Sequence, residues 1–149
     1  MRIHILTGMS RAVWLFVPLG VVFFATCPAA ADIVQPAYRR CGTGPRINCI
    51  VDGDTLWNDG VKIRIADIDA PEISQPHCAT EKALGERATL RLMELVNVGP
   101  FAILAWKNRD QDRNGRKLRV LVRNGRSLGD ILVSEGLART WAGRRQPWC

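Results

Sequence analysis

The chain has 149 residues and a formal net charge of +7 at pH 7, from 21 lysines and arginines against 14 acidic residues. This length fits one small domain with a modest core and excludes an arrangement of several full-sized domains. The excess of positive charge favours a polyanionic partner, which leaves nucleic acid, anionic lipid or acidic polysaccharide. Only two histidines occur, so a mechanism that needs a pair of catalytic histidines is excluded if the first is removed with the N-terminus.

Residues 1–31 have the pattern of a secretory signal peptide. A positively charged start precedes an apolar stretch over residues 12–25, and Ala29–Ala31 forms a small-residue cleavage site. The apolar stretch is shorter than the roughly 20 residues that a membrane-spanning helix needs. An uncleaved membrane anchor and a lipoprotein cleavage before Cys27 are the alternatives. Cleavage after residue 31 would leave a charge of 19 − 14 = +5 and a periplasmic or secreted protein without stable membrane association.

The rest of the chain contains four cysteines, which are Cys41, Cys49, Cys78 and Cys149. An even number of cysteines in a small exported domain predicts two disulfides, each contributing about 2–4 kcal/mol. Three pairings are open, and we expect one of the bonds to tie the C-terminal cysteine back to the domain. Zinc binding is the alternative, although there is no Cys-x-x-Cys pair and His77 is the one histidine in this part of the sequence.

The first elements after the signal are short. Residues 32–46 contain several prolines and glycines and predict a leader loop, and residues 47–51 predict a strand. Alternating segments over residues 55–57 and 61–66 flank Asn58-Asp59-Gly60, which indicates a β-hairpin. In its second strand the expected inner face carries Val61, Ile63 and Ile65, and the other face carries Lys62, Arg64 and Ala66.

Residues 79–98 have apolar side chains at helical spacing, and Gly99-Pro100 would end that helix. The expected buried face consists of Leu84, Ala88, Leu92, Leu95 and Val96, and the residues off that face are Glu81, Lys82, Glu86, Arg87 and Arg91. Residues 101–106 predict a buried strand and residues 118–122 another strand. The remaining expected elements are a short helix opened by a capping box at Ser127 and Asp130 and ended by Gly136, and a last strand over residues 137–141.

Several short strands with two helices predict an α+β fold. The same pattern favours a small closed barrel that carries the helices. We therefore expect residues 47–149 to form one domain with two to three helices. We also expect this domain to be a monomer.

The most informative stretch holds five carboxylates within 21 residues, with two cations among them. The acids are Asp52, Asp54, Asp67, Asp69 and Glu72, and the cations are Lys62 and Arg64. Hard cations such as Ca²⁺ prefer oxygen ligands at about 2.3–2.6 Å, and arginine forks match phosphate geometry. Since His77 lies in a predicted surface loop, the general base should be a carboxylate. The pattern predicts metal-assisted chemistry on a phosphodiester.

Three segments and Arg64 resemble the signature of the staphylococcal nuclease (thermonuclease) family. The segments are Val-Asp-Gly-Asp-Thr at 51–55, Asp-Ala-Pro-Glu at 69–72 and Asp-Arg-Asn-Gly-Arg at 112–116. They stand in the family's order at similar spacing, and the resemblance runs from about Cys49 to Arg139. It implies a five-stranded OB-fold barrel with helices, which agrees with the pattern of expected elements.

The resemblance also implies a role for each matching residue. Asp54 and Asp69 would be Ca²⁺ ligands, and the backbone carbonyl of Ala70 would be the remaining ligand that the protein supplies. Asp52 would lie in the outer coordination shell. Glu72 would orient or deprotonate the attacking water. Arg64 and Arg116 would grip the phosphate. Alanine variants of Glu72, Arg64 and Arg116 are each expected to lose most activity while remaining folded.

Further residues are candidates for binding nucleic acid. They are Lys62, Arg113, Trp141 and Arg144, with Arg145 beside the last. Trp141 either stacks on a base or covers the barrel, and the two adjacent arginines contact phosphates or only solvent. The function implied is an exported Ca²⁺-dependent nuclease on DNA and RNA that prefers single strands and leaves 3′-phosphate ends. The alternatives are a non-catalytic OB-fold module that binds nucleic acid or sugar, and a disulfide-tied scaffold.

Overall fold

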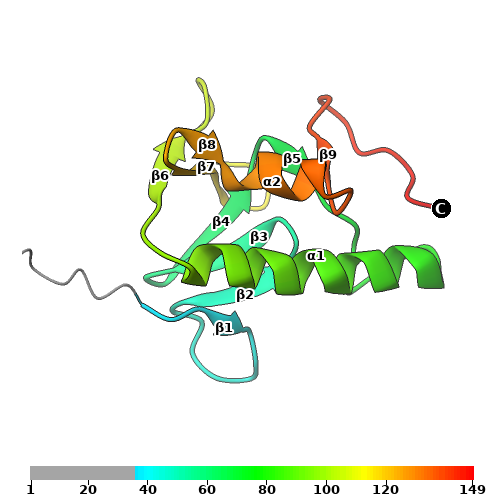
Figure 1. Ribbon diagram of the computed structural model, residues 1–149, viewed down its shortest axis with the longest axis horizontal. Helices are drawn as coiled ribbons and strands as arrows, with labels where there is room; N and C mark the ends of the chain where they lie inside the picture. Colours follow the sequence, from blue (N-terminus) through cyan, green and yellow to red (C-terminus); the bar gives the residue numbers. More distant parts are fainter. Residues whose placement is uncertain (1–35) are drawn as a thin grey trace, which may run out of the picture. The chain divides into compact units, whose positions relative to one another are not determined.

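The computed structural model describes residues 36–149, so the predicted signal peptide lies outside the described residues. This part of the chain has an α+β fold with two helices (Figure 1). Its helices are α1 (Ala79–Asn97) and α2 (Leu128–Ser134). Its strands are β1 (Arg39–Arg40), β2 (Cys49–Asp52), β3 (Thr55–Asn58), β4 (Val61–Ile65), β5 (Ile68–Asp69), β6 (Ala102–Ala105), β7 (Lys117–Arg123), β8 (Arg126–Ser127) and β9 (Arg139–Thr140). Neither helix is long and apolar enough to span a membrane.

The strands form one mixed sheet and one separate pair. The sheet order is β1-β2-β3-β4-β7-β6, with β8 paired to β7, and β5 pairs with β9. The β1/β2 and β4/β7 pairs are parallel, and the other pairs are antiparallel. Within the described chain no hydrogen-bonded pairing joins β1 to β6, so closure into a five-stranded OB barrel stays a prediction.

The predicted hairpin is confirmed. Strands β3 and β4 are antiparallel and turn at Asp59 and Gly60, which have φ angles of +48° and +77°. Glycine adopts positive φ without steric cost, which explains the turn at this dipeptide. On β4 the inner face is buried at Ile63 and Ile65, but Val61 is 45% exposed at the turn. The opposite face is also buried at Arg64, because other parts of the chain cover it.

Helix α1 agrees with its predicted bounds. Ala88, Leu92, Leu95 and Val96 enter the main core, which also contains Ile50, Leu56, Ile65 and Leu121. In Figure 1 this helix lies beside β2, and α2 lies beside β5 and β9. Helix α2 begins at the predicted cap, where the Ser127 hydroxyl accepts hydrogen bonds from the N–H groups of Gly129 and Asp130.

Two expectations are wrong, for residues 101–106 and for the leader loop, and three short strands, β1, β5 and β8, were not predicted. The strand expected to be buried over 101–106 is β6, an edge strand that is mostly exposed and pairs only with β7. The expected leader loop contains β1, which pairs with β2. Strand β5 was not predicted, and its partner β9 is shorter than the strand expected over residues 137–141. Two-residue strands are held by tertiary pairing and have too few residues to show a period of two.

Both predicted disulfides are present. Cys41 pairs with Cys49 and joins the segment after β1 to the start of β2. Cys78 pairs with Cys149, which confirms that the C-terminal cysteine is tied back to the domain. Its partner is the N-cap residue of α1, so the end of the chain is fixed to the first turn of that helix.

Close packing against α1 fixes the position of the acidic segments. A Cβ on Gly53 would lie 2.7 Å from Cβ of Ala88 and 2.8 Å from Cβ of Ala70. A Cβ on Gly85 would lie 2.7 Å from the carbonyl oxygen of Pro71. Only glycine permits these approaches. The turn before Asp54 and the segment before Glu72 therefore both lie directly on α1.

Candidate functional site

A buried ion-pair cluster connects three of the predicted site residues. Arg64 on β4 points between Asp54, in the turn after β2, and Asp69 on β5. Its Nη1 lies 2.7 Å from Oδ2 of Asp54, and its Nη2 lies 3.5 Å from Oδ1 of Asp69. All three side chains are at most 7% exposed. The two predicted Ca²⁺ ligands therefore face one guanidinium and lie on one side of the fold.

The carboxylate of Asp54 is fixed by the backbone of the neighbouring segments. Its Oδ2 accepts a hydrogen bond from the N–H of Ala70 at 3.0 Å, and its Oδ1 accepts one from the Thr55 hydroxyl at 2.9 Å. Asp52 accepts a hydrogen bond from the N–H of Asp54 at 3.1 Å. Burial and the nearby charge of Asp54 raise the pKa of Asp52 to about 7. Acidic groups are thus crowded here at an energetic cost that a cation would relieve.

Asp69, like Asp52, is a carboxylate whose pKa is raised by burial. The nearby charge of Arg145 opposes that shift. Among the described residues its buried Oδ1 atom makes no hydrogen bond, and Nη2 of Arg64 and Nε of Arg145 each lie 3.5 Å from it. The carboxylates of Asp54 and Asp69, which contact the same guanidinium, and the Ala70 carbonyl offer the oxygen ligands that a hard divalent cation prefers. In the described chain no three His, Cys, Asp or Glu side chains are grouped to hold a metal, and the predicted set has only two direct carboxylate ligands.

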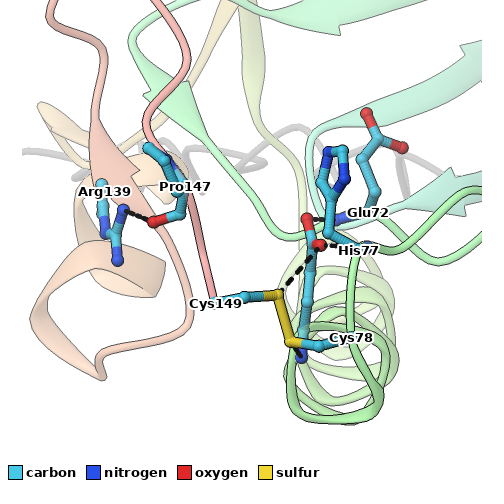
Figure 2. Close-up of a disulfide and its surroundings, with 7 residues drawn as sticks. Glu72, His77, Cys78, Arg139, Pro147 and Cys149 are labelled. Carbon is cyan, nitrogen blue, oxygen red and sulfur yellow. Dashed lines mark hydrogen bonds between the residues drawn. A yellow bond between two sulfur atoms is a disulfide. The ribbon is translucent and has the colours of Figure 1, made fainter.

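Glu72 lies between this cluster and solvent. Its side chain is 27% exposed, and one carboxylate oxygen is ion-paired with Nη1 of Arg145. Its backbone N–H donates a hydrogen bond to Oε1 of Glu81 at 3.3 Å, and the N–H of His77 donates to Oε2 at 2.6 Å. Figure 2 shows Glu72 and His77 above the start of α1, beside the Cys78–Cys149 disulfide. Glu81 therefore anchors the backbone that carries Glu72.

The expectation that Glu81 lies off the buried face of the helix is wrong, since the residue is only 2% exposed. It is the third residue after the N-cap, where a carboxylate can accept hydrogen bonds from free backbone N–H groups. Here those donors belong to the preceding loop and not to the helix itself. The spacing of apolar residues does not indicate that Glu81 accepts these hydrogen bonds. Its position three residues after Cys78 does indicate it.

Glu81→Gln is expected to lower the free energy of unfolding at pH 7 by about 1.5–3 kcal/mol, because two N–H groups lose a charged acceptor. The hydrogen bond from His77, against the opposing effect of burial, holds the pKa of Glu81 below its ordinary 4.5. A lowered folded-state pKa means that this stabilisation is present above the unfolded-state pKa and is lost as the pH falls through the folded-state value.

Urea denaturation at a series of pH values checks this. The difference in unfolding free energy between Glu81→Gln and wild type should shrink below about pH 4.5. Glu94→Gln is the matched control on the same helix, because the Glu94 side chain is 61% exposed; it should change stability by about 0.5 kcal/mol or less. A difference that stays constant from neutral to acid pH would contradict the role given to the Glu81 carboxylate.

The predicted 112–116 motif forms a turn that aims Arg116 at the same cluster. Asp112 Oδ1 accepts hydrogen bonds from the N–H groups of Asn114 and Arg116, and Gly115 has a φ of +76°. Asp112 Oδ2 accepts from Nε of Arg116 at 2.6 Å. Nη1 of Arg116 reaches the Thr55 hydroxyl at 3.4 Å, and that hydroxyl donates to Asp54. The strand register explains this meeting, since Thr55 pairs with Arg64 and Arg64 pairs with Leu118.

Arg64, Glu72 and Arg116 line a cleft with a volume of about 900 Å³. Six arginines and two acids line it, so the cleft is cationic. The lining arginines are Arg64, Arg109, Arg113, Arg116, Arg144 and Arg145, and the acids are Glu72 and Asp112. Trp106 and Trp141 supply aromatic surface. Such a surface suits an extended polyanion with flat groups.

Most, but not all, of the residues predicted to bind nucleic acid lie in this cleft. Arg113, Trp141 and Arg144 line it, and the indole of Trp141 is half-buried, with its centroid 5.8 Å from the Arg64 guanidinium carbon. Lys62 does not line it, and its Nζ lies 6.0 Å from the Trp57 ring centroid. Trp106 and Arg109 were missed because the first was assigned to a buried strand and the second to no element. Asp67 is not part of the cluster, since it accepts a hydrogen bond from the Ser127 hydroxyl.

Residues 62–147 match the family described as "Staphylococcal nuclease homologue". The chain belongs to the staphylococcal nuclease family. It is 31% identical over 141 residues to a protein named micrococcal nuclease from Shigella flexneri, which covers 86% of this chain and 68% of that protein. It is 38% identical over 93 residues to the SPbeta prophage-derived endonuclease YokF and 36% identical over 93 residues to endonuclease YncB, both from Bacillus subtilis (strain 168). Each match covers 60% of this chain, but only 31% and 44% of the two relatives.

Proposed function

We propose that this protein is an exported nuclease that hydrolyses phosphodiester bonds of DNA and RNA with the help of Ca²⁺. One observation carries the proposal: Arg64 and Arg116 both line a cationic cleft, and both connect to the buried carboxylate of Asp54, Arg64 directly and Arg116 through the Thr55 hydroxyl. Such a set of groups is suited to a phosphate with increasing negative charge. Family membership and relatives named as nucleases support the same reading.

Asp54, Asp69 and the Ala70 carbonyl would hold the cation, and Asp52 would lie behind them. When bound, Ca²⁺ would act as a Lewis acid on a phosphate oxygen and leave coordination positions open for water. Arg64 is fixed by two acids and Arg116 by Asp112, so both guanidinium groups are preorganised and need little reorganisation during the reaction. Their charges offset the charge that builds up on the phosphate in the transition state.

Two carboxylates line the cleft, and since Asp112 is held by Arg116, Glu72 is the one assigned to the attacking water. It would accept a proton from the attacking water as the water oxygen bonds to phosphorus. The bond from phosphorus to the 5′-oxygen would break in line, and the leaving oxygen would take a proton from solvent water, which gives a 3′-phosphate and a free 5′-hydroxyl. No histidine is needed for this step, and His77 lies in the loop outside the arginine-lined cleft.

The cleft favours single strands over duplexes. Trp106 and Trp141 lie among its arginines, and unpaired bases can stack on aromatic rings while arginines track the backbone. Contacts with phosphates release counterions, so binding should weaken as salt is raised. The two disulfides support export to an oxidising compartment, either the periplasm or the medium. We further propose that the mature protein acts as a monomer and does not stay bound to the membrane.

One assay tests the proposal. The mature protein, purified with its disulfides intact, is incubated with denatured DNA, duplex DNA or RNA in Ca²⁺ or in chelator, and the ends of the products are analysed. Cleavage in Ca²⁺ alone, fastest on denatured DNA and leaving 3′-phosphates, is the expected result. Retention of the strands without cleavage in Ca²⁺ would identify a binding module. If the strands are neither retained nor cleaved, the scaffold is the remaining alternative.

A further inference from the structure

The segment after β9 brings an additional arginine to the candidate site. Nη1 of Arg145 is ion-paired with Oε1 of Glu72, and its Nε lies 3.5 Å from Oδ1 of Asp69. Its side chain lines both the large cleft and a smaller hollow of about 350 Å³ next to it. Glu72 also lines both. The pair therefore stands on the wall between the two hollows.

The segment that carries Arg145 has no regular secondary structure, yet it is fixed at several points. Arg139 on β9 donates a hydrogen bond to the carbonyl of Pro147 at 3.0 Å, and its guanidinium lies 3.8 Å from the Trp148 ring centroid. The backbone N–H of Trp141 donates to the Asp67 carbonyl at 2.8 Å. At its end Cys149 is bonded to Cys78, as Figure 2 shows.

The two members of the pair share one anchor. Glu81 lies in the first turn of α1 and accepts a hydrogen bond from the backbone N–H of Glu72. Cys78 is the N-cap of the same turn, and its disulfide with Cys149 holds the C-terminal segment that carries Arg145. Cys149 Sγ lies 3.8 Å from Oε2 of Glu81. The N-terminal end of α1 thus fixes the position of the Glu72 backbone and also the position of the segment whose arginine contacts the Glu72 carboxylate.

The other two arginines of the site are already paired elsewhere. Arg64 contacts Asp54, Asp69 and the Ile65 carbonyl, and Arg116 is held by Asp112. Among the described residues the ion pair of Glu72 is made with Arg145. A glutamate on a loop has several rotamers, and one such contact selects among them.

We propose that Arg145 is a positioning residue that orients the Glu72 carboxylate toward the cleft, and that the Cys78–Cys149 disulfide holds it in place. This rests on the nuclease function proposed above. Arg145 acts through Glu72 and is not itself required to touch the phosphate. Since a misplacement of about 1 Å at a reacting group can cost about 10²-fold in rate, loss of this contact should lower kcat well below wild type.

The first test compares Arg145→Ala with Arg126→Ala, an exposed arginine whose side chain bonds only to Ser134 in the described structure. On denatured DNA in Ca²⁺, Arg145→Ala should lower kcat about tenfold or more with KM within about threefold, and Arg126→Ala should match wild type. Arg145→Lys should recover part of kcat, because it keeps the charge but not the fork. Equal kcat for Arg145→Ala and Arg126→Ala in an active protein would overturn the inference and leave the proposed function intact.

Two further variants separate positioning from a general structural effect. In a Glu72→Gln background, Arg145→Ala should change the residual kcat less than about twofold, since residues that act as a unit are not additive. Cys149→Ser should lower kcat in the wild type but not further in Arg145→Ala. A full additional loss in either double variant would mean that Arg145 does not act through Glu72 or is not held by the disulfide.

A double-mutant cycle of stability tests the contact between Arg145 and Glu72 without an activity assay. Urea midpoints of wild type, Arg145→Ala, Glu72→Gln and the double variant should be non-additive, with a smaller shift for the double variant than the sum of the single shifts. Additive midpoints would overturn the inference even if the protein hydrolyses nucleic acid. If wild type does not cleave any of the substrates in Ca²⁺, the proposed function fails, while this cycle still reports whether Arg145 holds Glu72.

Discussion

Replacing Arg116 by alanine is expected to lower kcat on denatured DNA about 10²–10³-fold while the protein stays folded, because a preorganised cation at the reacting phosphate typically contributes that much. The stability should change little. Arg116 is 21% exposed, and its ion pair with Asp112 lies at the rim of the cleft. Asp112 would keep the N–H donors of Asn114 and residue 116, so the turn itself is preserved.

Steady-state kinetics with urea denaturation on the same samples check this prediction. Arg116→Lys should stay close to the alanine variant in kcat, because a single ammonium lacks the planar fork that spans Asp112 and the Thr55 hydroxyl. Arg126→Ala serves again as the matched arginine control outside the cleft. Wild-type kcat for Arg116→Ala would remove this residue from the mechanism and would leave Arg64 as the one arginine assigned to the phosphate.

The parts of the fold that the sequence predicted well are those with local signals. The β3–β4 hairpin follows from Asp59-Gly60 between alternating segments, and α1 follows from apolar spacing that ends before Gly99-Pro100. The Ser127 cap is likewise readable from a few neighbouring residues. In each case the residues that determine the element are contained within it or adjoin it.

The parts that were missed depend on residues far apart in the chain. Glu72 and Arg145 are separated by 73 positions, so no local pattern connects them. The sequence predicted that the C-terminal cysteine is tied back to the domain, but its partner Cys78 lies 71 positions away and the pairing was open. Alternation on β4 indicated an inner and an outer face, but it did not reveal that acids and Trp141 cover the outer face at Arg64. Strand β6 is apolar and was expected to be buried, yet it lies at the edge of the sheet.

The sequence indicated which residues to expect at the candidate site better than it indicated how buried they are. The family resemblance supplied Asp54, Asp69, Arg64 and Arg116, and the structure places them together. It could not supply their burial, because exposure depends on what packs over each residue. Burial changes the expected behaviour of one of these residues in particular. Alanine at Arg64 is expected from sequence to leave a folded, inactive protein, whereas its environment predicts a large loss of stability as well.

Arg64→Ala is expected to lower kcat at least as much as Arg116→Ala and to lower the free energy of unfolding by about 3–5 kcal/mol, the usual effect of removing one partner from a buried ion pair. Arg64 is 7% exposed, and Asp54 and Asp69 are no more exposed. Without the guanidinium, Asp54 would lose its ion pair and Asp69 would keep only the 3.5 Å contact with Nε of Arg145. A loss of this size is a large part of the stability of a small domain.

The same charges predict a rescue that distinguishes electrostatics from lost packing. Ca²⁺ that binds the folded carboxylates stabilises the folded state by mass action, and in Arg64→Ala it would also supply the missing positive charge. The thermal midpoint of this variant should therefore rise more with Ca²⁺ than that of wild type. Adding Asp69→Asn to Arg64→Ala should raise the midpoint without Ca²⁺, because it removes one of the two buried charges, yet it should restore no activity. A midpoint of Arg64→Ala within about 1 °C of wild type in chelator would show that the buried acids do not depend on this arginine.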